Sequence, residues 1–181
     1  MLKAVFRYFL LIYLTSILTA CDNNTELMKS AMSGDIQAVK SQLDSGADVN
    51  ARNSYGWTAL GHAARKGRTE VVELLLDNGA NIDAQDQRGW TAIMQAAAKG
   101  RGETLALLIR RGANLELHDK DGWTALMWAV NQENLPIVRQ LIKAGVDVNA
   151  KANDGRTALL LAHGEGNVEI GEALRQAGAK F

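Results

Sequence analysis

The sequence has very few of the residues that hold a chain together through covalent or metal links. Its 181 residues include one Cys, one Pro and three His. A single Cys excludes an internal disulfide framework and a Cys-rich zinc site. The charges also balance, with 20 Lys and Arg against 20 Asp and Glu, so the basic surplus that binds nucleic-acid phosphates is absent. We therefore predict no metal site, no cofactor and no nucleic-acid partner.

The first 20 residues differ in character from the rest of the chain. Lys3 and Arg7 precede a stretch without charge at residues 8–20. An ordinary membrane-spanning helix needs roughly 20 apolar residues, so this stretch is too short. A basic start followed by a short apolar run is typical of a secretory signal peptide. We therefore predict a signal peptide at residues 1–20 and a mature chain at residues 21–181.

The only Cys stands directly after this segment. Leu18, Thr19, Ala20 and Cys21 resemble the lipobox of bacterial lipoproteins, in which small residues precede a Cys that is acylated. The resemblance implies that Cys21 carries lipid and becomes the mature N-terminus. Two or three acyl chains anchor a protein stably, since each buried methylene contributes roughly 0.8 kcal/mol. An ordinary signal peptide followed by a buried or incidental thiol is the alternative.

The lipobox also implies a location in the periplasm, anchored to a membrane. Asp22 directly follows the Cys and resembles the signal that keeps lipoproteins of enteric bacteria on the inner membrane. The outer membrane stays the alternative. Only three residues separate Cys21 from Thr25, and they span little more than about 10 Å at about 3.5 Å per residue. We expect the folded part of the chain to lie close to the membrane.

From Thr25 onward the sequence repeats with a period of 33 residues. One glycine series consists of Gly56, Gly89, Gly122 and Gly155, each followed by Thr at two residues and by Ala at three. A second series with the same spacing consists of Gly46, Gly79, Gly112, Gly145 and Gly178. A fixed period of this length predicts a stack of equal units, because one unit cannot bury its own apolar face.

The repeated pattern resembles the ankyrin repeat, with its turn Gly, a Thr and Leu at the first helix, a mid-repeat Gly and a final Gly-Ala-Asp-Val-Asn. Residues 53–85 (NSYGWTALGHAARKGRTEVVELLLDNGANIDAQ) match it best. The resemblance implies an all-α solenoid of about five repeats, in which helix-turn-helix pairs are joined by β-hairpin loops. We expect one ankyrin repeat domain with units at about 24–52, 53–85, 86–118, 119–151 and 152–181.

Local signals support these units independently. Thr58 and its equivalents can cap the first helix through the hydroxyl group. Val71 and Leu75 lie at helical spacing on one face of the second helix. Pro136 falls in the first turn of a second helix, where its missing N–H does no harm. Glu133 stands where other units have Gly, which leaves the conformation of that turn in doubt.

The usual binding surface of the family is the concave side, built from hairpin tips and first helices. The commonly exposed positions of this side contain eight basic and three acidic residues. The basic ones are Arg52, Arg65, Lys66, Arg88, Lys99, Lys120, Lys151 and Arg156, and the acidic ones are Asp121, Asp154 and Glu165. A positive face on an otherwise slightly acidic mature chain attracts an acidic partner. Alternatively, the long basic side chains only solvate the hairpin tips.

Tryptophan follows the same period, at Trp57, Trp90 and Trp123. Aromatic side chains flanked by Arg are typical of interface hot spots, whereas packing of the indoles on neighbouring hairpins is the structural alternative. Trp128 departs from the period and is expected beside Trp123. Tyr55 is not demanded by the period. The predicted partner-binding residues are Tyr55, Trp57, Arg65, Lys66, Arg88, Trp90, Lys99, Lys120 and Trp123.

Catalytic groups are not recognisable in the sequence. His62, His118 and His163 fall at different positions of the repeat, without the spacing of metal ligands. No Gly-x-Ser-x-Gly elbow is present. Asp86 and Asp119 are better explained as acceptors for the hairpin backbone than as acid–base groups. We therefore predict no catalytic residue and a protein that is not an enzyme.

The sequence thus predicts a monomeric, lipid-anchored protein of the periplasm that binds a protein partner with an acidic surface. One form of this function is an inhibitor or immunity protein that covers the active site of an envelope enzyme. Another is an accessory protein that holds such an enzyme near the membrane. The alternative from a different class is a structural envelope component that binds peptidoglycan through its basic concave face.

Overall fold

The computed structural model describes residues 23–180. The predicted signal peptide, Cys21 and Asp22 lie outside the described residues. Ten helices occupy the described part, in five consecutive pairs. The pairs are α2 (Glu26–Ser33) with α3 (Ile36–Asp44), α4 (Ala59–Lys66) with α5 (Thr69–Asp77), α6 (Ala92–Ala98) with α7 (Gly102–Arg110), α8 (Ala125–Asn131) with α9 (Leu135–Lys143), and α10 (Ala158–Gly164) with α11 (Val168–Gln176).

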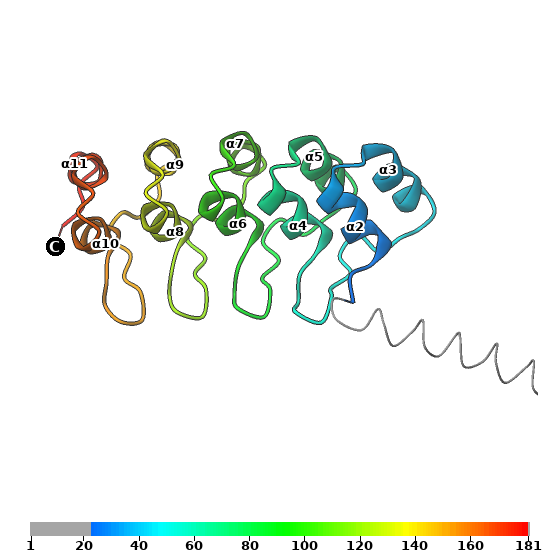
Figure 1. Cartoon of the computed structure of the whole chain (residues 1–181), viewed down its shortest axis with the longest axis horizontal. Helices are drawn as coiled ribbons and strands as arrows, with labels where there is room; N and C mark the ends of the chain where they lie inside the picture. The colour runs from blue at the N-terminus through cyan, green and yellow to red at the C-terminus, as the bar shows by residue number, and fades with distance from the viewer. Residues whose placement is uncertain (1–22, 181) are drawn as a thin grey trace, which may run out of the picture.

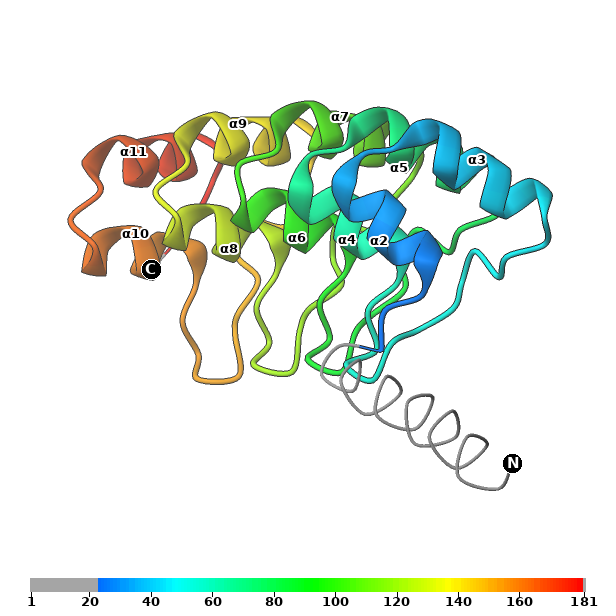
Figure 2. The same ribbon diagram turned by 45° about the vertical axis from the view of Figure 1, so that its right-hand side comes forward.

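The pairs stack side by side in chain order (Figure 1). The first helices of the pairs form one row and the second helices another, and the loops between pairs extend from the first row (Figure 1 and Figure 2). Contacts run within each pair and between neighbouring pairs, as in α2 with α4 and α3 with α5. The predicted all-α solenoid of about five units is confirmed. Each expected unit contains one helix pair.

The first helix of every pair begins after a Thr whose hydroxyl accepts the backbone N–H three residues further on. These residues are Thr25, Thr58, Thr91, Thr124 and Thr157. The predicted capping role is therefore confirmed in all five pairs. Loss of such a cap typically costs about 1 kcal/mol of stability, so the repeated Thr fixes where each pair begins.

The core runs along the stack between the two rows of helices. First helices contribute small side chains, such as Ala63 and Ala64, which are fully buried and allow neighbouring first helices to approach closely. Second helices contribute a buried Leu at one repeat position, in Leu75, Leu108, Leu141 and Leu174. Each such side chain gains roughly 1.5–3 kcal/mol from burial. Because every unit adds the same layer, the core is continuous from α2 to α11.

The two helices of a pair are joined by a turn with one residue in the left-handed region. Gly67 and Gly100 have φ values of 71° and 65° at this position. Glu133 has a φ of 53° at the equivalent position, so the turn keeps its usual conformation although a side chain is present. Pro136 lies in the first turn of α9, as predicted.

The loops between pairs are hairpins whose tips are closed by backbone hydrogen bonds. The N–H of Asn53 donates to the carbonyl of Trp57 at 3.0 Å, and the equivalent bond closes each later hairpin. Within residues 23–180 these hairpins form no strands, and their one isolated antiparallel bridge joins Lys151 and Thr157. The hairpins therefore rely on neighbouring units for order.

Hydrogen bonds between units supply that order. The N–H of Gln87 donates to the carbonyl of Tyr55 at 3.0 Å, which joins neighbouring hairpin tips. At the other end of each unit, Oδ1 of Asp83 accepts the N–H of Asn114 at 2.9 Å. The same link recurs at Asn50, Glu116 and Asn149, which accept the N–H groups of Asn81, Asp147 and Lys180. Each unit is thus linked to the next at both ends.

Candidate protein-binding face

The hairpins and the ends of the first helices share one side of the stack. We call this side the hairpin face and define it by residues 52–57, 85–90, 118–123 and 151–156 with the last turns of α4, α6, α8 and α10. The guanidinium of Arg65, in the last turn of α4, lies over the ring of Trp57 at 5.6 Å. This contact shows that the helix ends and the hairpins adjoin.

The structure does not bring all of the predicted contact residues to the surface. Those that are exposed are Tyr55, Lys66, Arg88, Lys99 and Lys120. Trp57 and Arg65 are half-buried. Trp90 and Trp123 are buried, each with 9% of its surface exposed. The exposed members of the predicted set are therefore four cations and one aromatic residue, Tyr55.

Three tryptophans form a stacked cluster beneath the hairpins. Trp128 lies between Trp90 and Trp123, with ring centroids 4.3 and 4.6 Å apart, and its Nε1 donates to Oδ2 of Asp119 at 2.9 Å. The predicted place of Trp128 beside Trp123 is confirmed. Of the two interpretations of Trp90 and Trp123, packing on neighbouring residues agrees with the structure, because stacking on Trp128 buries both rings. Their buried rings anchor the hairpins to the first helices.

Carboxylates at the hairpin bases hold the backbone of the tips. Oδ1 of Asp86 accepts the N–H groups of Arg88 at 2.8 Å and Trp90 at 2.9 Å. Asp119 makes the equivalent two bonds one unit later. The predicted structural role of Asp86 and Asp119 is confirmed. These bonds fix the hairpins before any partner arrives.

Arginine side chains lie over the indole rings. Arg88 lies over Trp90 at 5.1 Å, and Arg156 lies over the ring of Trp123 at 5.3 Å. Cation–π attraction holds these long side chains along the hairpins. A side chain that is already held in place loses less freedom when it binds a partner, which favours Arg88 as a contact residue.

Positive charge gathers on the N-terminal half of the hairpin face. Its exposed cations are Arg52, Lys66, Arg88, Lys99 and Lys120, which we call the basic patch. None of them takes part in an ion pair within residues 23–180. The exposed acidic residues of this face, Asp121, Asp154 and Glu165, follow the patch in the chain. Between Arg52 and Lys120 the exposed charge of this face is therefore positive.

Tyr55 is the exposed aromatic residue of this half of the face. Its surface is 53% exposed, yet its backbone is fixed, because its N–H donates to Oδ1 of Asn53 at 2.9 Å. Its carbonyl accepts the N–H of Gln87. An aromatic ring on a fixed backbone is typical of interface hot spots.

The last hairpin carries its own ion pair. Nε of Arg156 donates to Oδ2 of Asp154 at 2.6 Å, and the N–H of Arg156 donates to Oδ1 at 3.0 Å. The backbone bond, followed by the side-chain bond, holds the pKa of Asp154 below its ordinary value. The ion pair neutralises Arg156, so within residues 23–180 Lys151 is the exposed cation of this hairpin that has no ion pair.

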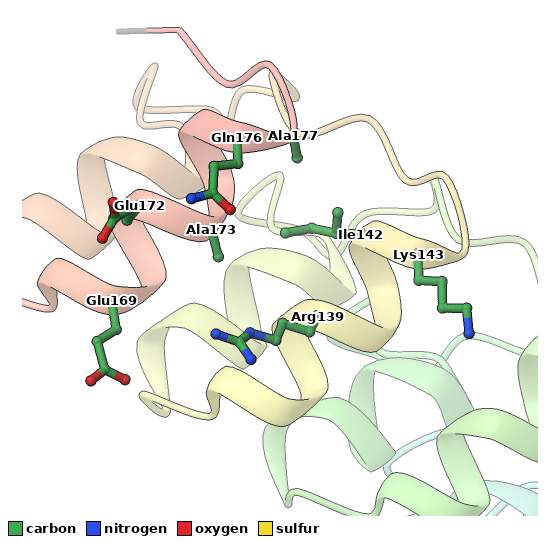
Figure 3. A pocket seen from close by; sticks show the side chains of 8 residues that line it. All are labelled: Arg139, Ile142, Lys143, Glu169, Glu172, Ala173, Gln176 and Ala177. Atoms are coloured by element: carbon green, nitrogen blue, oxygen red, sulfur yellow. The ribbon is translucent and has the colours of Figure 1, made fainter.

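A groove of about 430 Å³ lies between α9 and α11, in the row of second helices (Figure 3). Arg139 and Lys143 line it from α9, and Glu169 and Glu172 line it from α11. None of these four residues was predicted from the sequence as a contact residue. Ala173 and Ala177 of the last helix pair also line it.

Ion pairs join the second helices elsewhere in the row. Arg111, which directly follows α7 and lies two units before Ala177, pairs with residues of α5. Its guanidinium contacts Asp77 at 2.7 Å and Glu73 at 2.9 Å. Hydrogen bonds to Asp77 and Glu73 raise the pKa of Arg111.

Metal-binding clusters and membrane-spanning helices were sought among the described residues. In residues 23–180, no cluster of three or more His, Cys, Asp or Glu side chains is placed to hold a metal ion. None of the helices in this part has the length and apolar character needed to cross a membrane.

A stack of helix pairs with one extended, pre-ordered side defines a repeat protein of the binding class. The chain belongs to the ankyrin repeats: the family model described as Ankyrin repeats (3 copies) matches residues 27–119 and 93–181. These two matches together include all five helix pairs. No curated protein matches the chain. Ankyrin repeats indicate a protein–protein interaction module.

Proposed function

We propose that this protein is a lipid-anchored periplasmic module that binds an acidic protein partner through the basic patch. The partner is an envelope enzyme, which the module inhibits or holds near the membrane. The observation that carries the proposal is the group of five exposed cations on a pre-ordered face, outside any ion pair of residues 23–180.

The repeat places two of these cations in register. Lys66 and Lys99 occupy equivalent positions at the ends of the first helices, and Arg88 and Lys120 lie in successive hairpins. A single exposed ion pair contributes only about 0–1 kcal/mol. Several cations on neighbouring units can contact one acidic surface together and increase the association rate. Tyr55 adds an aromatic contact at the edge of the patch.

The first described residues lie beside the first hairpin, which supports a position of the hairpin face close to the membrane. Nδ2 of Asn53, at the first hairpin, donates to Oδ1 of Asn24 at 2.7 Å. Two residues separate Cys21 from Asn24, so a lipid on Cys21 would hold this end of the hairpin face within about 10 Å of the membrane.

Affinity capture from envelope extract tests the binding face. The full chain is compared with a Lys66→Glu, Lys99→Glu variant and with an Arg139→Glu, Lys143→Glu control. All four side chains are exposed, and both variants change the net charge equally. We expect a stoichiometric partner to be lost only from the first variant. Loss from both, or from neither, contradicts the assignment of the basic patch.

Metabolic labelling with a radioactive fatty acid tests the anchor. We expect label and membrane association in the wild-type protein and neither in Cys21→Ser. A Cys21→Ser protein that keeps both would contradict the lipid anchor. Asp22 favours the inner membrane, which fractionation of the two membranes checks. A flexible spacer inserted after Asp22 should weaken function if proximity to the membrane matters.

The basic patch also suits a second function, the binding of peptidoglycan, because the stem peptides of the wall carry carboxylates. Co-sedimentation with purified sacculi separates the two functions. Salt-sensitive sedimentation of the wild type that Lys66→Glu, Lys99→Glu abolishes, without a captured protein, favours wall binding. Absence of sedimentation at low salt removes this alternative.

A further inference from the structure

Arg111 shows how a charged side chain binds between neighbouring second helices. It directly follows α7, and its guanidinium contacts both Asp77 and Glu73 of α5. These two carboxylates lie one turn apart on the same face of α5, because residues four apart are neighbours on a helix surface. The space between two second helices can therefore receive the end of one long side chain, which then contacts two residues of the preceding helix.

The same three repeat positions recur two units later with the charge reversed. Arg139 and Lys143 of α9 occupy the positions of the two carboxylates of α5, and Ala177 occupies the position of Arg111. The α9 side therefore carries two cations where the α5 side carries two carboxylates. The long side chain that would contact them is replaced by a methyl group.

The groove of about 430 Å³ between α9 and α11 contains these positions. Its lining residues all belong to α9, to α11 and to Ala177. Half-buried apolar side chains line it at Ile142, Ala173 and Ala177. Figure 3 shows the side chain of Arg139 extending from α9 toward α11. The groove thus offers apolar contacts next to a guanidinium, and its volume falls in the range of ligand sites, roughly 300–1,000 Å³.

The charges on the two sides of the groove have no ion-pair partner in the chain. Arg139 and Lys143 are exposed on α9, Glu169 and Glu172 are exposed on α11, and none of the four takes part in an ion pair within residues 23–180. A uniformly acidic ligand would be repelled by α11, and a uniformly basic one by α9. A ligand that carries one charge of each sign complements both sides.

We propose that this groove binds a short segment of a partner protein in which an acidic residue lies close to a basic one. The carboxylate takes the place that the Arg111 side chain takes between α5 and α7, and it contacts Arg139 and Lys143. A carboxylate can accept two parallel hydrogen bonds from one guanidinium, which favours Arg139 as the main contact. The basic residue of the segment contacts Glu169 or Glu172.

The groove lies apart from the hairpin face. It belongs to the row of second helices, whereas the hairpins extend from the row of first helices (Figure 1). A segment bound in the groove therefore leaves the basic patch free. The two proposals are independent, and the variants at Lys66 and Lys99 separate failure of one from failure of the other.

NMR titration of the full chain in detergent micelles tests the binding. The probes are blocked peptides in which Glu and Lys are separated by increasing numbers of Ala. We expect at least one of them to shift the amide signals of Ala173 and Ala177 with a dissociation constant of about 1 mM or below. The same peptide with Gln for both charged residues should bind at least about tenfold more weakly. No saturable shift up to about 5 mM with any peptide overturns the proposal.

Matched variants locate the binding site. Arg139→Gln, Lys143→Gln should weaken binding of the peptide at least about fivefold, because both contacts to its carboxylate are lost. Lys66→Gln, Lys99→Gln removes the same number of cations from the basic patch and should leave the dissociation constant unchanged. Equal weakening by the two variants would mean that only the net charge matters, and it would overturn the assignment to the groove.

Ala177→Glu tests the arrangement without a peptide. Its carboxylate should contact the cations of α9 and block the peptide, which weakens binding at least about fivefold. A double-mutant cycle compares the change in urea midpoint that Ala177→Glu causes in the wild type with the change in Arg139→Gln, Lys143→Gln. We expect the more favourable change in the wild type. The cycle cancels the unfavourable effect of a negative charge at a helix C-terminus, and equal changes would overturn the arrangement.

Discussion

Replacing Glu133 by Gly is expected to increase the free energy of unfolding. Glu133 has a φ of 53°, in the region that the equivalent residues of the other four units occupy as Gly. A residue with a Cβ is destabilised there by roughly 1–2 kcal/mol. Gly loses more conformational freedom on folding, which costs roughly 0.5–1 kcal/mol. The difference predicts a net stabilisation of about 0.5–1 kcal/mol for Glu133→Gly.

Two glycines at the same repeat position provide matched controls. Gly166→Ala adds a Cβ at a φ of 70° with no atom within 4 Å, so it introduces the backbone strain alone and should destabilise. Gly100→Ala should destabilise more, because its Cβ would lie 2.5 Å from Nδ2 of Asn134. Glu133→Ala keeps a Cβ and removes the charge, so it should change stability little.

Urea unfolding followed by far-UV circular dichroism measures these differences. Variants with the same slope are compared by their midpoints, since an unchanged slope means that the same surface is exposed on unfolding. The reasoning is refuted if Glu133→Gly unfolds at a lower urea concentration than the wild type. It is also refuted if Glu133→Ala stabilises as much as Glu133→Gly, because charge would then explain the effect.

Three further changes test other contacts. Gly61→Ala should stabilise by about 0.5–1 kcal/mol, since Gly is unfavourable within a helix and the added Cβ would lie 3.7 Å from Oγ1 of Thr58; a lower urea midpoint would contradict this. Trp128→Phe should destabilise by about 1–3 kcal/mol, because Oδ2 of the buried Asp119 loses its donor, and unchanged urea unfolding would show that the bond contributes nothing. The pKa of the Asp154 carboxyl, measured by NMR, should lie below the ordinary value of about 3.9. The stability that this carboxyl contributes is therefore present above its unfolded pKa and is lost as the pH falls through its folded pKa. Arg156→Ala should raise that midpoint only in part, since the backbone N–H is the larger cause; an unchanged midpoint would mean that the side chain has no effect.

The fold was predictable because the repeated residues perform backbone tasks that depend on local sequence. A Thr caps each first helix and a Gly takes the left-handed turn in four of five units. Glu133 shows the limit of this reasoning. The turn keeps its left-handed conformation although Glu is unfavourable there, because the neighbouring units hold it in place. The sequence of one repeat alone does not predict this conformation.

The candidate site was predictable in position but not in exposure. The repeat correctly placed Trp90 and Trp123 near the hairpins, yet their burial depends on Trp128, whose side chain stacks between both rings. Such packing involves residues from three different segments, and spacing alone does not specify it. The exposure of the basic patch could be predicted from the sequence, because long side chains at hairpin tips and helix ends are exposed in almost any packing.

The links between units do not depend on one residue type. Asn50, Asp83, Glu116 and Asn149 each accept a backbone N–H 31 residues further along the chain, although their side chains differ in length and charge. A duplicated or deleted stretch of 33 residues would therefore meet compatible acceptors on both sides. Over evolutionary time the hairpin face can lengthen or shorten by whole units, so the size of a partner can change without redesign of the scaffold.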